Sequence, residues 1–503
     1  MILTMNETRR EGAKLNRNTS RDSILLAGAR LFSTAASMLI TMILAKALDL
    51  SANGTYAQCA TIISIGLSLI SLGLMDGGNY FFANANSRQE RQEFIDAILF
   101  LVYLSGFILA GLLILFREAI GRYFSNAALS GLMWLVAIRP MLSGLIMVLN
   151  VLYIATGRAK TVVLRNAAIS FVHLIIVVVT ALTTKNVVMI LSLYLLAELV
   201  TDGLMLWSFG RGEYSVRPRL PKADTVQKIL QYCLPMAAYI AMNSLMRDTD
   251  KLIIGRFEPT EMQAIYSNCA KILPLDVISG AFYTMLVPKI TKRIAVGQFD
   301  EAGNLFSDYL KVGLLSTAVF AVAISLCADQ AICLLYSKEY LLGRNVFLLY
   351  NIVEFLKFAN VTIVISAVGK TKTLMTISAA ALAANLGISL VLYRWLGFAG
   401  PAVGTVVVTV ITIAVLFFIS ARILHTSPTR FLDFKFLAGY FVKALAAAAL
   451  CLTLKHVLVK ADAHQYLILF AVCGLFCVFM LLTNIRQIKA ALTQIDRNSE
   501  ETV

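Results

Sequence analysis

Long apolar runs recur along this chain from residue 24 to residue 484, and many of them reach the ~20 residues that a helix needs to cross a bilayer. In lipid every backbone N–H and C=O must be hydrogen-bonded within the protein, so only helices and closed barrels can span a membrane. The runs are continuously apolar rather than alternating, which excludes a barrel. Because 59% of the 503 residues are hydrophobic and only 15% are charged, we predict an all-α polytopic membrane protein.

The spacing of the runs predicts about fourteen transmembrane helices: two six-helix lobes and two additional C-terminal helices. The spans of the first lobe are expected near 24–48, 55–75, 95–116, 129–154, 161–183 and 187–209. The others are expected near 229–255, 264–286, 309–335, 345–368, 374–393, 398–421, 437–459 and 465–484. This predicts a tail (1–22), an N-lobe (23–210), a linker (211–228), a C-lobe (229–422), the additional pair (423–485) and a second tail (486–503).

The net charge of +15 lies mostly in alternate loops. If the N-terminus is cytoplasmic, the even-numbered connections and both tails carry roughly 25 Lys and Arg, against about 10 on the other side. The positive-inside rule therefore predicts two cytoplasmic termini, with Lys222 and Lys370 inside and Lys185 and Arg344 outside. The same pattern accounts for the net positive charge by contact of the loops with membrane lipids. We therefore do not expect nucleic acid as a partner.

The stretch 231–271 concentrates charge at the end of an apolar segment. Its first helix carries Pro235 and ends in Arg247, Asp248, Asp250 and Lys251. Ionisable residues at such a position are costly unless they pair or face water, which makes them candidates for function. Alternatively they form an interfacial charge cluster near the membrane surface.

An internal repeat connects this stretch with an earlier one. Tyr56-Ala-Gln-Cys-Ala aligns with Tyr266-Ser-Asn-Cys-Ala, and Lys46 then falls opposite Arg256 at the end of the preceding helix. A repeat in a polytopic protein predicts two similar lobes with a substrate path where they meet. Six helices per lobe would relate the lobes by a pseudo-two-fold axis along the membrane normal.

The sequence carries no recognisable catalytic or metal-binding pattern. Its four histidines have no paired-ligand spacing. His173, in an apolar helix, could titrate, but the favoured interpretation is a hydrogen-bonded structural residue. Gly369-Lys370-Thr371 lacks the upstream glycine of a P-loop. The eight cysteines lie in or beside apolar runs, as core residues do. We therefore predict a transporter, not an enzyme, with no cofactor and no metal.

Charged residues inside the predicted spans are the main candidates for a binding site. Cations around a water-filled cavity would suit an anionic head group such as a diphosphate. The alternative is that cations and acids pair with one another: Arg30 or Arg139 with Glu198 or Asp202, and Lys271 with Asp250 or Asp276. The candidate head-group residues are Arg30, Arg139, Arg165, Lys271 and Lys357, and the candidate coupling or gating residues are Glu198, Asp202, Asp248, Asp250 and Glu354. Arg165, near the start of its span, reaches the interface more easily than Arg30 or Arg139.

Several short motifs resemble the polysaccharide-exporting branch of the multidrug/oligosaccharidyl-lipid/polysaccharide (MOP) flippases. They are Tyr232-Cys-Leu-Pro235, Asp250-Lys-Leu-Ile-Ile-Gly255, Ile265-Tyr266-Ser267 with Ala270-Lys271, and Ala45-Lys46-Ala47-Leu48 with Gly54-Thr55-Tyr56-Ala57. The resemblance implies a Wzx-like flippase that moves an undecaprenyl-diphosphate-linked oligosaccharide to the periplasmic leaflet of a bacterial inner membrane. It also implies alternating access of two lobes, coupling to an ion gradient or membrane potential, and a polysaccharide polymerase and chain-length machinery as possible partners.

Other functions remain open. The two C-terminal spans depart from the commoner twelve-helix form, and peptidoglycan-precursor flippases also have fourteen helices. A drug or small-cation exporter of the same superfamily should have an acidic cavity, whereas the cations in these spans point to an anionic cargo. A membrane polymerase or ligase would need a sizeable extracytoplasmic loop, and no connection in the sequence is long enough to form an autonomous domain.

Overall fold

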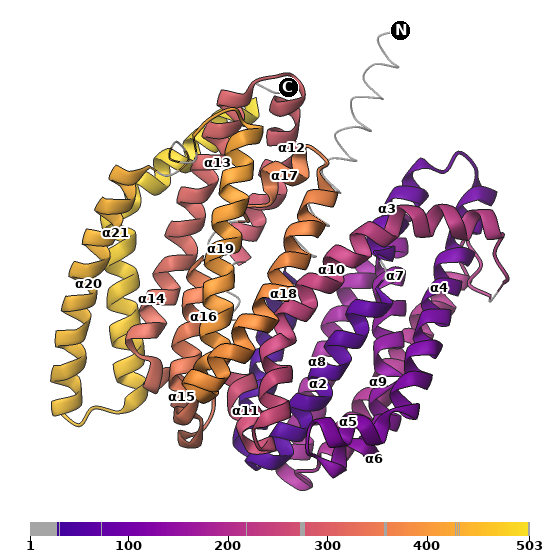
Figure 1. Cartoon of the computed structure of the whole chain (residues 1–503), viewed down its shortest axis with the longest axis horizontal. Coiled ribbons are helices and arrows are strands. Elements are labelled where there is room, and N and C mark those ends of the chain that lie inside the picture. Colours follow the sequence, from indigo (N-terminus) through magenta and orange to yellow (C-terminus); the bar gives the residue numbers. More distant parts are fainter. Residues whose placement is uncertain are drawn as a thin grey trace. The chain divides into compact units, whose positions relative to one another are not determined.

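The computed structural model of the chain describes residues 28–29, 31–71, 73–217, 219–271, 277–356, 360–427, 429, 431 and 433–500. Within these residues every regular element is a helix and none is a strand (Figure 1). The all-α fold class predicted from the continuous apolar runs is thereby confirmed for the described part of the chain.

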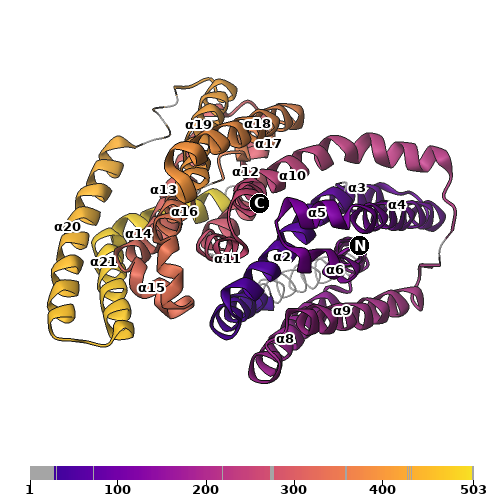
Figure 2. The same cartoon turned by 60° about the horizontal axis from the view of Figure 1, so that its bottom comes forward.

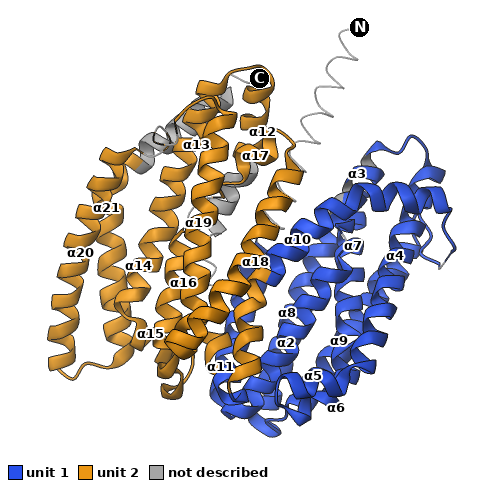
Figure 3. Cartoon of the chain, viewed as in Figure 1, with its two compact units in different colours: residues 1–245, 259–264 blue, residues 246–258, 265–503 orange. Residues whose placement is uncertain are grey.

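The chain divides into two compact units, shown in blue and orange in Figure 3. Unit 1 contains residues 1–245 and 259–264, and unit 2 contains residues 246–258 and 265–503. The division falls inside α10 (Ala223–Phe257) and α11 (Thr260–Cys269), because both helices have residues in each unit. The lobe boundary expected at 211–228 and the symmetry between lobes stay predictions.

Four of the helices of unit 1 begin at a capping side chain. Before α10 the unit contains the helix Leu31–Ala47, α2 (Leu50–Ile70), α3 (Leu74–Asn84), α4 (Arg88–Leu115), α5 (Arg117–Tyr123), α6 (Ala127–Val136), α7 (Arg139–Ala155), α8 (Ala159–Thr183) and α9 (Val187–Gly210). Asp49, Ser87, Asn126 and Asn186 accept hydrogen bonds from backbone N–H groups in the first turns of α2, α4, α6 and α9. Such caps satisfy donors that have no partner within the helix.

The core of unit 1 lies where α3, α4 and α7 meet. Ile98 and Tyr153 are buried there, in one cluster with Ile70 from the end of α2. A Cβ atom on Gly144 of α7 would lie 2.8 Å from the Ile70 side chain, so only glycine allows this close approach of α2 and α7.

The segment between α9 and α10 is attached to the start of α4. The Gln92 side-chain amide donates to the carbonyl of Ser215 at 2.8 Å and accepts from the N–H of the same residue at 2.8 Å. Lys222 forms an ion pair with Glu93 at 2.7 Å. These contacts hold the segment against the helices of unit 1.

Unit 2 contains most of the remaining helices. After α11 they are α12 (Val277–Ala295), α13 (Phe299–Gly313), a π-helical turn (Leu314–Ala318), α14 (Val319–Leu326), α15 (Ala328–Leu335), a 3-10 helix (Lys338–Gly343), α16 (Arg344–Leu356), α17 (Ile363–Ala367), α18 (Thr371–Leu396), a 3-10 turn (Gly397–Ala399), α19 (Gly400–Ile423), α20 (Phe434–Lys460) and α21 (Gln465–Glu500). Gly397 has φ +61°, which glycine adopts without strain and which lets α18 turn directly into α19.

The two C-terminal helices form a pair that is fastened to the rest of unit 2. Figures 1 and 2 show α20 and α21 side by side in both views. The Lys455 ammonium on α20 donates to the carbonyl of Leu326 at 2.8 Å, and the Cys473 thiol on α21 donates to the carbonyl of Ala323 at 3.3 Å. Both acceptors lie near the end of α14.

The chain is a multi-pass membrane protein. Nine helical stretches among the described residues are long and apolar enough to cross a membrane, and one of them, 371–423, contains both α18 and α19. Other predicted spans are interrupted: α2 ends at Ile70 before α3 begins at Leu74, and α16 ends before α17. Large apolar side chains such as Leu182, which is 81% exposed, project outward as a lipid-facing surface requires.

Candidate functional site

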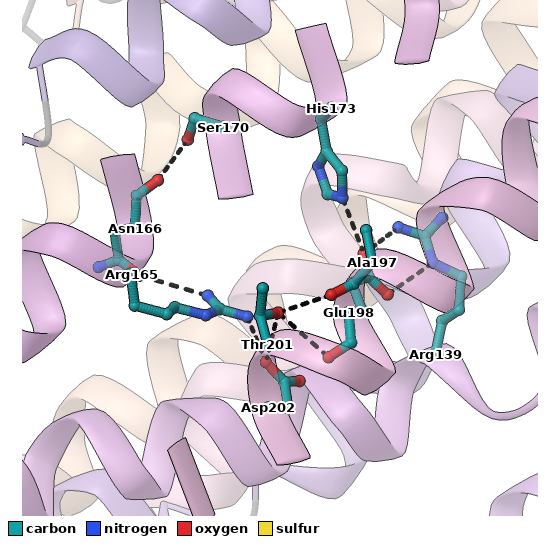
Figure 4. A network of polar contacts seen from close by, with 9 residues as sticks. All are labelled: Arg139, Arg165, Asn166, Ser170, His173, Ala197, Glu198, Thr201 and Asp202. Atoms are coloured by element: carbon teal, nitrogen blue, oxygen red, sulfur yellow. Dashed lines mark hydrogen bonds and ion pairs between the residues drawn. The ribbon is translucent and has the colours of Figure 1, made fainter. Parts of the chain in front are cut away.

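Four charged side chains from α7, α8 and α9 meet in the interior of unit 1 (Figure 4). Glu198 and Asp202 are four residues apart on α9, so both project from one face of that helix. Only 8% of Glu198 and 2% of Asp202 are exposed. Buried carboxylates of this kind need partners, and α7 and α8 each supply an arginine.

Arg139 binds Glu198 through two hydrogen bonds. Its Nε donates to Oε2 at 3.0 Å and its Nη2 donates to Oε1 at 2.5 Å, the two-point geometry in which guanidinium recognises an oxyanion. Arg139 is the first residue of α7 and Pro140 the second, a position where proline costs no helical hydrogen bond. The guanidinium also lies 5.5 Å from the ring centre of Tyr194.

Arg165 forms the second pair of the cluster. Its Nη2 donates to Oδ1 of Asp202 at 2.5 Å, and 13% of the arginine side chain is exposed. Neighbouring polar groups continue the network along α8, where Ser170 donates to the carbonyl of Asn166 at 2.8 Å. Asp202 projects toward α8 from the next helix and supplies this partner, and the expectation that Arg165 reaches the interface more easily stays a prediction.

His173, interpreted from the sequence as a structural residue, lies beside the Arg139–Glu198 pair. Its ring stacks on Tyr194 with centroids 4.1 Å apart, and its Nε2 lies 3.7 Å from Oε1 of Glu198. Within the described part of the chain this buried Nε2 has no hydrogen-bond partner. A lone histidine in an apolar run gave no sequence signal for this neighbour, which comes from another helix.

A second polar cluster lies in unit 2 around Asp250. This residue is 0% exposed, and its Oδ2 accepts hydrogen bonds from the hydroxyls of Tyr266, at 3.0 Å, and Tyr350. Its Oδ1 accepts from the backbone N–H of Lys251 at 3.0 Å. The Lys251 side chain pairs with Asp248 at 2.7 Å. Of the charged residues predicted near the end of this span, Asp248 pairs with Lys251 and Asp250 accepts from tyrosines of α11 and α16, whereas Arg247 is exposed.

The remaining candidates are not all brought together. Glu354 is buried on α16, one turn after Tyr350 of the second cluster, whereas Lys271 follows α11 and is exposed. Arg30, Asp276 and Lys357 lie outside the described residues. Among all residues that the structure describes, no group of three or more His, Cys, Asp or Glu is arranged to hold a metal ion.

The two copies of the repeated motif occupy matching places in their helices. Tyr56 is the seventh residue of α2 and Tyr266 the seventh of α11, counting from Leu50 and Thr260. Cys59 and Cys269 follow three residues later, and both are fully buried. Each helix begins shortly after another helix ends. The repeat is therefore present in the local helical structure as well as in the sequence. The symmetry of whole lobes stays a prediction.

Comparisons with known proteins concern both sequence and fold. The family described as "Polysaccharide biosynthesis protein" matches residues 43–342. A solved structure of the lipid II flippase MurJ, in an inward closed conformation, has a TM-score of 0.73 at 13% identity, and the match covers 92% of this chain and 100% of that one.

Two transporters show the same likeness. An inward-facing multidrug resistance MATE family transporter of the MOP superfamily has a TM-score of 0.67 at 13% identity, over 78% of this chain and 96% of that one. A MOP superfamily transporter from Pyrococcus furiosus, described as having a binding pocket of reverse polarity, has a TM-score of 0.54 at 14% identity, over 81% and 96%. At these identities the likeness is one of fold. No protein with a curated description matches the sequence.

Proposed function

Because the chain belongs to the polysaccharide biosynthesis protein family and has the fold of MOP-superfamily transporters, we propose that it flips an undecaprenyl-diphosphate-linked oligosaccharide across the bacterial inner membrane. The cargo would pass from the cytoplasmic to the periplasmic leaflet and serve the synthesis of an O-antigen, capsule or exopolysaccharide. In this proposal the protein is a transporter without catalytic chemistry, and a polysaccharide polymerase and chain-length machinery are its partners.

The observation that carries the proposal is the pair of largely buried arginines in unit 1, each with 13% of its side chain exposed. Arg139 and Arg165 lie within membrane-spanning helices, and each already holds an oxyanion. A diphosphate offers the same recognition elements as the carboxylates, with more oxygens for a planar guanidinium to bind. The head group can therefore take the place of Glu198 or Asp202 in another conformation, which keeps the guanidinium paired in both states.

The other candidate residues complete the proposed path. Arg30, Lys271 and Lys357 are proposed as further head-group contacts, and Asp202, Asp248, Asp250, Glu198 and Glu354 as coupling or gating residues. We propose that about fourteen helices cross the membrane, since several predicted spans are formed by two consecutive helices rather than one. The charge pattern of the loops supports a cytoplasmic location of both termini.

One observation favours a second candidate function. The likeness to the lipid II flippase MurJ extends over 92% of this chain, so the fold suits a peptidoglycan precursor as well. Both cargoes carry a diphosphate, and the buried arginines do not distinguish between them. A drug exporter is less well supported, because the cations of unit 1 match an anionic cargo.

The proposal is tested by following lipid-linked sugars in a strain that lacks the gene. Radiolabelled oligosaccharide lipid should accumulate in this strain, and the wild-type gene should return it to the normal level. Arg139→Ala should fail to restore export. Arg344→Ala is the matched control, because Arg344 forms an exposed ion pair with Asp329 and should restore export fully.

Two results would contradict this function. If the gene leaves the pool of oligosaccharide lipid unchanged, the chain does not flip that cargo. If depletion of the protein instead causes peptidoglycan precursor to accumulate, the second candidate is correct.

A further inference from the structure

One carboxylate of unit 1 has two basic neighbours on different helices. Oε1 of Glu198 accepts a hydrogen bond from Arg139 Nη2 at 2.5 Å and lies 3.7 Å from Nε2 of His173 (Figure 4). The imidazole is thus just beyond hydrogen-bonding distance of an oxygen that the arginine already occupies. A side-chain shift of about 1 Å would bring the imidazole into hydrogen-bonding contact.

The imidazole is held in place but is not satisfied. Tyr194 covers one face of the ring, and Nε2 has no hydrogen-bond partner among the described residues. A buried nitrogen without a partner carries a desolvation penalty. Protonation to imidazolium would remove that penalty, because both ring nitrogens then carry a hydrogen and Nε2 can donate a charge-assisted hydrogen bond to Glu198.

We propose that His173 is a proton-binding site linked to the head-group site at Arg139. A proton on His173 draws Glu198 away from Arg139 and leaves that guanidinium available to the diphosphate of the cargo. The proton comes from water when the head group binds and returns to water when it leaves. This inference rests on the proposed function and names how the site is regulated.

The charge balance of the cluster explains why the two events are linked. Two guanidinium groups and two carboxylates cancel in the structure as it stands. A proton on His173 adds one positive charge, which a low-dielectric interior disfavours unless an anion enters with it. The charged and titratable side chains that face the imidazole are Arg139 on α7, Arg165 on α8, and Tyr194 and Glu198 on α9. Tyr56 and Cys59 on α2 approach Arg139, and Asp202 on α9 approaches Arg165.

The linkage is compatible with outward transport. A diphosphate diester has one ionised oxygen on each phosphorus, so the head group with one accompanying proton is still negative. The membrane potential, negative inside, favours the outward movement of that remaining charge. The proton therefore lowers the cost of carrying the head group through the protein without removing the electrical driving force.

The test measures binding and proton uptake together. The probe is farnesyl diphosphate N-acetylglucosamine, a short diphosphate diester, titrated calorimetrically into the purified full-length protein. Two buffers of different ionisation enthalpy are used at several pH values around the range in which an ordinary histidine titrates. The wild-type protein should take up as much as one proton per probe, and Kd should fall by up to about tenfold for each unit that the pH is lowered.

Three variants sharpen the measurement. His173→Gln should bind the probe with a Kd that no longer depends on pH and without proton uptake. His173→Arg keeps a positive charge at every pH, so it should bind as the wild type does at low pH. His456→Gln, at an exposed position on α20, should match the wild type. Thermal unfolding of each variant confirms that it is folded.

The outcomes separate the two proposals. Binding without proton uptake in the wild type would overturn the role of His173 and leave the head-group site intact. Proton uptake that persists in His173→Gln would place the proton on another group, Glu198 first, and would also overturn it. A wild-type protein that binds the probe at no tested pH would contradict the head-group site itself, and the linkage with it.

Discussion

The buried carboxylates Glu198 and Asp202 of unit 1 have different surroundings from Asp250 of unit 2. In unit 1 Glu198 and Asp202 each face a guanidinium group, with contacts as short as 2.5 Å. In unit 2 Asp250 accepts from two tyrosine hydroxyls and a backbone N–H. The first arrangement pairs opposite charges, and the second satisfies a carboxylate through neutral donors.

This difference determines what a disturbance leaves behind. A carboxylate that is removed from unit 1 leaves a guanidinium buried without a counter-ion, and guanidinium stays charged at every accessible pH. Removal of the Asp250 carboxylate from unit 2 leaves two neutral hydroxyls. In unit 1 only another anion can replace the carboxylate of an ion pair without leaving an unbalanced charge. The hydrogen-bonded cluster around Asp250 tolerates a change in charge at lower cost.

The largest effect is expected for Glu198→Ala. This variant strands Arg139, and breaking a buried pair from one side costs about 3–5 kcal/mol. Protein abundance and the midpoint of thermal unfolding should both fall. The double variant Arg139→Ala, Glu198→Ala removes both charges and should be more stable than Glu198→Ala alone. Equal losses in the two variants would mean that the pair is not energetically coupled.

Exchanging the two residues tests whether Arg139 has a second role. Arg139→Glu combined with Glu198→Arg should recover much of the abundance, because the opposite charges are kept close together. Export should stay low if Arg139 also binds the head group, since the cation then lies in the wrong place. Recovery of both abundance and export would favour a purely structural ion pair.

A smaller effect is expected when the two kinds of carboxylate are replaced by their amides. Asp202→Asn keeps an acceptor for Arg165 but removes the negative charge that balances the guanidinium. Asp250→Asn keeps an acceptor for the tyrosine hydroxyls, which are neutral and need no balancing charge. Asp250→Asn should cost about 1–2 kcal/mol, and Asp202→Asn should cost more. Thermal unfolding in detergent gives the order, and the reverse order would invalidate the comparison.

Loss of one tyrosine hydroxyl should have a still smaller effect. Tyr350→Phe and Tyr266→Phe each remove one hydrogen bond to Asp250, at a cost of about 0.5–1.5 kcal/mol. In an Asp250→Asn background the same changes should cost less, because the charge-assisted part of the bond is already gone. Full additivity between the changes at Tyr350 and Asp250 would show that the contact contributes nothing.

The smallest effect is expected at an exposed ion pair. Arg344 and Asp329 approach to 2.7 Å, but about half of each side chain is exposed. Arg344→Ala should change stability by about 0–1 kcal/mol. It is the matched control for Arg139→Ala, and a comparable loss in both variants would argue that burial is not what distinguishes the pairs in unit 1.

Arg139, Arg165, Glu198 and Asp202 were all candidates from the sequence, but how they pair was not predicted. Glu198 and Asp202 are one helical turn apart, so their common face follows from periodicity alone. Their partners depend on the rotation of α7 and α8 about their own axes, which apolar runs without strong amphipathic character leave open. Pairing of Arg139 with Glu198 or Asp202 was one stated alternative, whereas the bond from Arg165 to Asp202 and the place of His173 were not foreseen.

Hydropathy predicted the helical class of the fold and the positions of its long apolar helices, but not the breaks within them. Continuous apolar runs identify helices, and the additional C-terminal pair was visible from its two late runs. The interruption between α2 and α3 was missed because apolar residues continue across it. The start of α7 at Arg139 was also missed, because the span 129–154 was expected to be continuous, although Pro140 suits the second position of a helix.

The π-helical turn Leu314–Ala318 lies between α13 and α14 and accommodates one residue more than a regular α-helical turn would. Such a turn absorbs one surplus residue locally, so the helix after it keeps its orientation. Without that surplus, all of α14 would turn by about 100° relative to α13. Ala321 and Ala323, both buried, would then leave their present faces, and the contact of α14 with α21 would have to be rebuilt. The length of this segment is therefore constrained more tightly than its composition.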